Sequence, residues 1–255
     1  MRRAREWAPA LVVFALVIAV WEGSISAFHV QQFLLPRPSD IVKTFWTARH
    51  TLWPAGWYTF KEALGGFAIG SALGIVVATL VGRFRNAGTA IMPLAIAANA
   101  VPIIAFAPIA GAWFGEVSPN SKIAIAAVLC FLPVMVNTLR GLQSANPRQI
   151  ELMRSYAAGE LEIWRRVRVP TALPFVFTAL KVASVLAMIG AIVGEYFGGA
   201  FNALGVIINS DAQIFDFVTA WAGILVASLL GLALYGAVSG AERLVVRWAP
   251  DTRDA

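Results

Sequence analysis

Long, uninterrupted runs of apolar residues alternate with short polar segments along this chain. A helix of about 20 apolar residues crosses a hydrocarbon core about 30 Å thick, and every run reaches that length. A spanning β-strand would instead show strict alternation of apolar and polar positions over about ten residues, which the runs lack. The pattern predicts an all-α polytopic membrane protein with about six transmembrane helices. They lie near residues 8–27, 60–81, 88–114, 120–139, 171–194 and 216–239.

The composition agrees with this assignment. Hydrophobic residues make up 59% of the chain and charged residues 13%, and the mean hydropathy is +0.73. Soluble domains are about 45–50% apolar, so the surplus has to face lipid. The single cysteine, Cys130, falls inside the fourth run, which excludes a disulfide framework and a cysteine-rich metal site. We expect it to be a small buried residue.

Positive charges are distributed unevenly between the two alternating sets of loops. Fourteen of the 20 lysines and arginines lie in the N-terminal segment, the 82–87 turn, the 140–170 loop and the C-terminal tail, whereas five lie in the opposite set. Short cytoplasmic loops carry the excess of Lys and Arg, so both termini and the 140–170 loop are predicted to be cytoplasmic. The net charge of +6 then reflects orientation in the lipid bilayer, and no nucleic-acid partner is expected.

The first run could also be interpreted as a secretory signal peptide, because three arginines precede it and small residues follow it. Five further runs favour an uncleaved first helix instead.

Glycines recur at every fourth position in three parts of the chain. Helices in lipid associate through close approach at small residues, because apolar side chains gain little by leaving lipid for one another. These stripes predict tight helix packing, within one subunit or across a dimer, that is either static or a sliding surface. Their members are Gly66, Gly70 and Gly74, then Gly190, Gly194 and Gly198, then Gly236 and Gly240.

The third run contains Pro93, Pro102 and Pro108. Each proline removes a helical N–H and crowds the carbonyl four residues earlier, so this helix should be bent or broken. Broken helices occur in membranes where a watery cavity satisfies the freed backbone groups, although proline also serves packing alone. Pro102 and Pro108 are therefore candidates for a translocation path.

Ionisable residues inside membrane helices are functional candidates by default. Lys181 lies within the fifth run, where it either lines a cytoplasmic-side cavity or extends its ammonium group to the interface. Glu62, Glu195, Asp211 and Asp216 lie toward the outer boundary, where we expect solvated carboxylates. Glu195 is in addition a candidate for the translocation path.

Catalytic motifs are absent from the sequence. No pair of carboxylates and no Ser, His and Asp grouping occurs at a spacing that suits catalysis, which argues against a membrane-embedded enzyme. No G-x-x-x-x-G-K-[ST] motif occurs either, so the chain itself is not expected to hydrolyse ATP. We expect no metal site and no cofactor in this chain, and ATP with Mg²⁺ would be bound by a partner ATPase.

The segment from Asn146 to Pro170 concentrates charge in an otherwise apolar chain. Asn146 followed by Pro147 is a typical helix start, and Gly159 is expected to break the segment into two short helices before Pro170. Such an element is too short to span the bilayer and could rest on anionic lipid or dock on a soluble partner. Acidic residues among the basic ones favour docking. The predicted apolar face consists of Ile150, Met153, Ala157, Leu161 and Trp164.

The same segment resembles the EAA loop of permease subunits of bacterial binding-protein-dependent ABC importers. That loop reads E-A-A, three residues, Gly, nine residues and I-x-L-P. Here Glu151 opens the E-A-A position, Ala157 takes the glycine position and Pro170 closes the motif without gaps. Leucine and methionine replace the two alanines, and Gly159 stands where it could supply the turn.

Further segments resemble the sulfonate, taurine and nitrate group of these permeases. They are "FLLPRPSDIV" (33–42), "VPIIAFAPIAGAWFG" (101–115), "LPVMVNTLRGL" (132–142) and "VGEYFGG" (193–199). The resemblance implies a single permease domain over residues 1–255, with its core at about 33–247. It implies the type I (MetI-like) importer fold in the bacterial cytoplasmic (inner) membrane.

The resemblance also implies partners and roles. Cytoplasmic ABC ATPase subunits, an extracytoplasmic solute-binding protein and a second permease copy in a homodimer would complete the transporter. Glu151, Arg154, Ala157, Gly159 and Pro170 would form the contact that couples the chain to the ATPase. The solute would be a sulfonate-, taurine- or nitrate-like small anion. The alternatives are a vitamin or pyrimidine precursor carried by the same mechanism, and a carrier that needs no ATPase.

Overall fold

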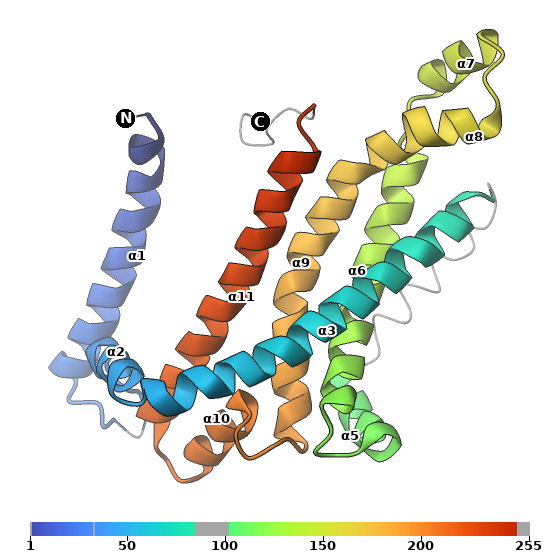
Figure 1. Ribbon diagram of the computed structural model, residues 1–255. Helices are drawn as coiled ribbons and strands as arrows, with labels where there is room; N and C mark the ends of the chain where they lie inside the picture. Colours follow the sequence, from blue (N-terminus) through green and yellow to red (C-terminus); the bar gives the residue numbers. More distant parts are fainter. Residues whose placement is uncertain (1, 33, 85–101, 249–255) are drawn as a thin grey trace.

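The computed structural model describes residues 2–32, 34–84 and 102–248, and every regular element in these ranges is a helix (Figure 1). Five helices in the described ranges are long and apolar enough to cross a membrane. They are α1 (Arg2–Ala27), α3 (Arg49–Gly82), α6 (Pro119–Gln143), α9 (Val169–Tyr196) and α11 (Phe217–Val245). These helices correspond to five of the predicted runs, and the all-α polytopic assignment is confirmed.

The third predicted run, 88–114, lies partly outside the described residues, as does Pro93. Its described part is α5 (Ile103–Phe114), a helix of 12 residues that is too short to cross a membrane by itself. Pro102 has an extended backbone and precedes the first helical residue, whereas Pro108 lies inside α5. A non-helical backbone at Pro102 agrees with the missing N–H of proline.

The helix α3 begins at Arg49, well before the predicted span at residue 60. Hydropathy marks the part of a helix that lies in hydrocarbon, and the first turns of α3 carry Arg49, His50 and Lys61. The helix therefore continues beyond the segment that the apolar pattern could mark.

The shorter helices lie at the two ends of the long ones. α7 (Pro147–Ser155) and α8 (Glu160–Ile163) lie at the same end as the start of α1 and the end of α11 (Figure 1). α2 (Pro38–Thr47), α5 and α10 (Leu204–Gln213) lie at the opposite end. The 140–170 loop thus lies at the same end of the long helices as the start of α1 and the end of α11. Its cytoplasmic location stays a prediction.

Glycines let α3 approach α6 closely. A methyl group added at Gly66 or Gly70 would collide with α6, and one at Gly74 would lie 2.8 Å from the carbonyl oxygen of Phe131. Two helices in contact at their backbones gain van der Waals energy that bulkier side chains would prevent. The first glycine stripe therefore forms a contact within one subunit.

The second stripe brings α9 against the same helix from another side. A methyl group at Gly190 would lie 2.7 Å from Cα of Ala126, and one at Gly194 would lie 3.1 Å from Cγ of Lys122. Gly198 lies beyond the end of α9 with a φ of +143°, which favours glycine.

The third stripe is different. A methyl group at Gly236 or Gly240 would meet no heavy atom within 4 Å in the described part of the chain. Among the described residues no helix covers this face of α11, so the packing expected for these two glycines within the subunit is not formed by that part of the chain. Packing across a dimer stays a prediction.

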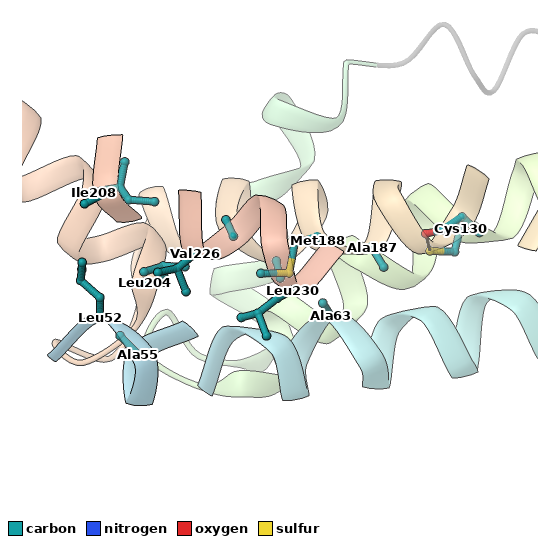
Figure 2. Close-up of a cluster of buried hydrophobic side chains, with 14 of the residues drawn as sticks. Leu52, Ala55, Ala63, Cys130, Ala187, Met188, Leu204, Ile208, Val226 and Leu230 are labelled. Atoms are coloured by element: carbon teal, nitrogen blue, oxygen red, sulfur yellow. Dashed lines mark hydrogen bonds between the residues drawn. The ribbon is translucent and has the colours of Figure 1, made fainter. Parts of the chain in front are cut away.

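Buried apolar side chains fill the space between α3, α9, α10 and α11 (Figure 2). Leu52, Leu204 and Val226 come from three of these helices and belong to one cluster. Cys130 of α6 belongs to the same cluster and is fully buried, as expected, with its Sγ 3.3 Å from the carbonyl oxygen of Ala183. This cluster and the glycine contacts hold the long helices in place.

Candidate functional site

Residues 146–170, here called the EAA segment, fold as two short helices joined by a turn. A π-helical turn (Trp164–Arg168) then leads into α9. Asn146 caps α7 as predicted, because its side-chain oxygen accepts a hydrogen bond from the N–H of Arg148 (3.0 Å), and Pro147 is the first helical residue.

The turn between α7 and α8 is made by Ala157. Its φ of 59° is left-handed, its N–H donates to the carbonyl of Arg154 (2.9 Å), and the N–H of Ala158 donates to that of Met153 (3.1 Å). These two bonds define a Schellman motif, in which glycine is the usual left-handed residue. Gly159 instead has an extended backbone, with φ −73° and ψ 162°. The expectation that Gly159 supplies the turn is wrong, since the two bonds place the left-handed residue at Ala157.

Ala157→Gly is expected to stabilise this turn by about 1 kcal/mol, because a residue with a Cβ pays roughly 1–2 kcal/mol in the left-handed conformation. Amide hydrogen exchange of α7 in the purified chain should therefore slow about fivefold. Gly159→Ala is the matched control, because an extended backbone with no neighbour within 4 Å accommodates the methyl group. Faster exchange in Ala157→Gly than in the unsubstituted chain would contradict the assignment.

Pro170 accounts for the π-helical turn. Proline has no N–H for the carbonyl four residues earlier, and its ring crowds that carbonyl. The helix widens just before it, where the N–H of Val169 donates to the carbonyl of Trp164, five residues earlier. α8, the π-helical turn and α9 consequently form one continuous helical run. The second short helix expected before Pro170 is therefore α8, and it continues through the π-helical turn into α9.

The EAA segment is anchored on one side and exposed on the other. Ile163 and Val167 are buried, and the ring of Trp164 lies next to Gly82 at the end of α3. α7 has no buried residue, so the single apolar face predicted for the segment is split. The left-handed turn at Ala157 changes the direction of the chain between α7 and α8. The apolar residues of the two helices therefore do not lie on one face. The exposed large apolar side chains of the segment are Leu152, Tyr156, Leu161 and Val169.

Two ion pairs form among the exposed charges of this segment. Arg154 lies 2.8 Å from Glu160 and bridges α7 to α8, and Arg166 lies 3.1 Å from Glu162. Exposed pairs contribute about 0–1 kcal/mol each. Glu151 is exposed and has no ion pair within the described residues, so its carboxylate is accessible to a partner.

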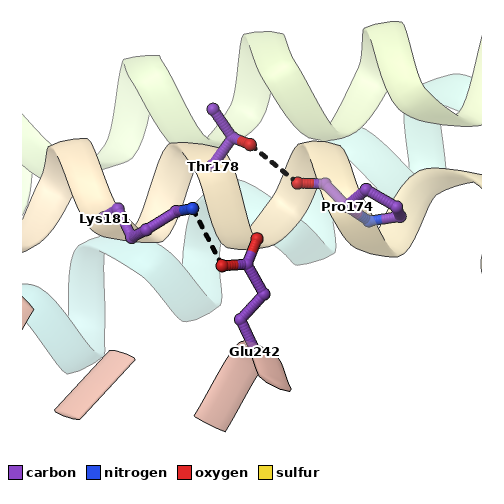
Figure 3. Close-up of polar contacts among 4 residues, drawn as sticks. All are labelled: Pro174, Thr178, Lys181 and Glu242. Carbon is purple, nitrogen blue, oxygen red and sulfur yellow. Dashed lines mark hydrogen bonds and ion pairs between the residues drawn. The ribbon is translucent and has the colours of Figure 1, made fainter. Parts of the chain in front are cut away.

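Lys181 is paired with a carboxylate. Its Nζ lies 2.8 Å from Oε2 of Glu242, which joins α9 to α11 (Figure 3). The two side chains are 21% and 23% exposed, so the pair is largely shielded. One turn earlier, the hydroxyl of Thr178 donates to the carbonyl of Pro174 (2.9 Å). The Lys181 charge is therefore neutralised by a residue 61 positions away, a partner that the apolar pattern did not indicate.

Three charged side chains are buried together around the start of α6 and the end of α9. Glu62, Lys122 and Glu195 are 3%, 1% and 1% exposed. They come from α3, α6 and α9, and Cγ of Lys122 would lie 3.1 Å from a methyl group at Gly194, the neighbour of Glu195 in the chain. The ammonium group of Lys122 also donates to the carbonyls of Glu116 and Ser118. The expectation that Glu62 and Glu195 are solvated is wrong, because packing of α3, α6 and α9 encloses them.

The other two outer carboxylates differ from each other. Asp216 is exposed, as expected, and caps α11 by accepting a hydrogen bond from the N–H of Thr219 (3.2 Å). Asp211 of α10 is half-buried, and burial raises the pKa of its carboxyl above the ordinary value, with a further increase from the Asp216 charge.

The candidates for a translocation path do not converge on one cavity. Pro102 and Pro108 belong to the α5 region, Lys181 pairs with α11, and Glu195 is enclosed beside α10. None of them lines the apolar groove of about 460 Å³ between α9, α10 and α11. In the ranges that the structure describes, no cluster of three or more His, Cys, Asp or Glu could hold a metal ion.

Comparison with known proteins gives a consistent result. The family model described as "Binding-protein-dependent transport system inner membrane component" matches residues 70–247. The riboflavin transport system permease protein RibX of Chloroflexus aurantiacus is 32% identical over 248 residues, covering 95% of this chain and 91% of the relative.

Two further relatives cover nearly the whole chain. The formylaminopyrimidine transport permease protein ThiX of Halalkalibacterium halodurans is 34% identical over 253 residues, covering 97% of this chain and 98% of the relative. The putative aliphatic sulfonates transport permease protein SsuC of Escherichia coli is 28% identical over 240 residues, covering 92% and 89%.

Proposed function

The chain belongs to the family of inner membrane components of binding-protein-dependent transport systems, and we propose that two copies of it form the translocation path of an ATP-driven importer. It is a multi-pass membrane permease subunit of an ABC importer, and the subunit itself is not an enzyme. Cytoplasmic ATPases, which would bind ATP and Mg²⁺, and an extracytoplasmic solute-binding protein are its proposed partners.

The EAA segment carries this proposal. Ile163 and Val167 anchor it to the helical bundle, whereas α7 projects with the accessible Glu151 and with exposed apolar side chains. A surface that is apolar, charged with both signs and firmly held at its base suits docking on a soluble protein. Arg154, Ala157 and Gly159 lie at or beside the turn of this surface, and Pro170 lies in the first turn of α9, which leads from it.

Movement of the docked segment would be transmitted along a helix. Because α8, the π-helical turn and α9 are continuous, closure of an ATPase dimer would displace α9 as a rod. ATP must favour the displaced arrangement by several kcal/mol to shift it from a rare to a dominant state. The resulting change in the outer ends of the helices would open the path to solute delivered by the binding protein.

Two classes of solute are supported by different observations. A nitrogen heterocycle is supported by the relatives named for riboflavin and formylaminopyrimidine transport, at 32% and 34% identity. It also agrees with the pairing of Lys181 with Glu242, which leaves that charge unavailable to an anion. A sulfonate-, taurine- or nitrate-like small anion is supported by the SsuC relative at 28% identity.

The test uses purified components in proteoliposomes. Solute uptake is measured with this chain alone and with its ATPase and binding protein, using the heterocycles and the anions as labelled solutes. We expect uptake only in the complete, ATP-supplied system, and only of a solute that raises the thermal unfolding temperature of the binding protein. Uptake by the chain alone would contradict the proposal and favour an ATPase-independent carrier.

A further inference from the structure

Glu195, at the end of α9 opposite the EAA segment, is bonded to two other helices. Its Oε1 accepts a hydrogen bond from the hydroxyl of Thr59 in α3 (2.7 Å), and its Oε2 accepts one from the N–H of Gly205 in α10 (2.6 Å). The same Thr59 oxygen accepts a hydrogen bond from the N–H of Leu204 (3.0 Å). Thr59, Glu195, Leu204 and Gly205 are here called the α10 clasp. They join α3, α9 and α10 through one hydroxyl, one carboxylate and two backbone N–H groups.

The clasp replaces the N-terminal cap that α10 lacks. Ala203, the residue before the helix, has no side chain that can cap it. The first N–H groups of a helix have no partner inside the helix, and a carboxylate is favoured there by the helix dipole. Thr59 and Glu195 satisfy the N–H groups of the first two residues of α10 from outside. The position of α10 is consequently set by α3 and α9.

The surroundings fit this arrangement closely. A methyl group at Gly205 would lie 2.6 Å from Oε2 of Glu195, so the absence of a side chain there lets the carboxylate reach the backbone. Glu62 of α3 and Lys122 of α6 are buried as well, and Oε2 of Glu62 has no hydrogen-bond partner among the described residues. Buried polar groups of this kind hold one arrangement strictly, because any displacement leaves them unsatisfied.

We propose that Glu195 and Thr59 are positioning residues that fasten α10 to the outer ends of α9 and α3, so that movement of α9 repositions α10. The inference rests on the proposed function, and it extends the proposed movement of α9 to α10 at the outer end of the helices. α9 begins at Val169 and contains Glu195 just before its end, so it carries a displacement about 39 Å from the EAA segment to the clasp. Without the clasp, α9 would move past α10 and the outer side would stay unchanged.

The decisive variant is Thr59→Val, which removes the bridging hydroxyl and nearly conserves the side-chain volume. Thr138→Val is the matched control, because Thr138 is 2% exposed in α6 and its hydroxyl has no hydrogen-bond partner among the described residues. Both variants are assembled with the ATPase and the binding protein in proteoliposomes. A spin label at Ser210→Cys, an exposed position on α10, reports whether ATP moves this helix.

We expect Thr59→Val to lower uptake and binding-protein stimulation of the ATPase by at least about fivefold and to abolish the ATP response of the label. Thr138→Val should retain all three, and Thr59→Ser, which restores the hydroxyl, should recover them. A general folding defect would not selectively abolish the response of the spin label on α10 to ATP. If Thr59→Val fails to accumulate, Glu195→Gln and Gly205→Ala disrupt the same clasp and should give the same loss.

An unchanged label response and unchanged stimulation in Thr59→Val would overturn the inference and leave the proposed function intact. Absence of uptake by the unsubstituted chain in the complete system would instead contradict the proposed function. The two failures are therefore distinguished by the unsubstituted chain.

Discussion

Gly70→Ala is expected to destabilise the folded chain by about 3 kcal/mol, at the upper end of the usual cost of overpacking. The new methyl group would collide with the carbonyl of Ala127 in α6. A backbone carbonyl cannot rotate away as a side chain can, so α3 and α6 would have to separate. That separation would also weaken the neighbouring contacts at Gly66 and Gly74. The measurement is denaturant-induced unfolding of the purified chain in detergent.

Gly236→Ala is the matched control for this prediction. Gly236 is also a glycine in the interior of a long helix, but its methyl group would meet nothing within 4 Å in the described part of the chain. Alanine has the higher helix propensity, by up to about 1 kcal/mol, so a small gain is expected. Equal losses for Gly70→Ala and Gly236→Ala would contradict the packing of α3 on α6.

A double replacement, Glu151→Lys with Gly159→Val, is expected to lower uptake at least tenfold, which corresponds to about 1.4 kcal/mol of lost coupling. Within the described residues Glu151 has no ion pair, and the space beside Gly159 is open. The extended backbone of Gly159 suits a β-branched residue. The variant should therefore fold and insert normally, and the loss would arise at the contact with the ATPase.

Uptake and ATP hydrolysis are measured together in proteoliposomes with the complete transporter. Gly23→Val serves as the control, because Gly23 is an equally open glycine in α1, away from the EAA segment. Membrane insertion of both variants is compared by extraction and size-exclusion chromatography. Normal uptake by the double variant would refute the coupling role assigned to Glu151 and Gly159.

Much of the fold could be predicted because the signals are local. Continuous apolar runs indicate membrane helices whatever their neighbours are, and five of them correspond to long helices in the described residues. The Asn146 cap follows from two adjacent residues. Periodic glycines indicate close packing but not the partner helix, so the contacts of Gly70 and the open face at Gly236 could not be distinguished in advance.

The candidate site was only partly predictable. Spacing and resemblance located the EAA segment, whereas the turn at Ala157 was missed because alanine rarely adopts a left-handed backbone. A signal was available, since Ala157 occupies the glycine position of the motif. The sequence predicts solvated side chains at Glu62 and Glu195, because position along the chain gives distance from a membrane boundary and not burial.

By itself, the sequence determined the helical membrane architecture, the position of the EAA segment and the lack of a nucleotide-binding motif, because each depends on residues close together in the chain. Only the tertiary structure decided which charges are enclosed and paired. Thr59 and Glu195 are 136 positions apart, and Lys181 and Glu242 are 61 apart. Such pairs form only after distant helices pack, because burial then removes water and leaves each polar group to be satisfied by its neighbours.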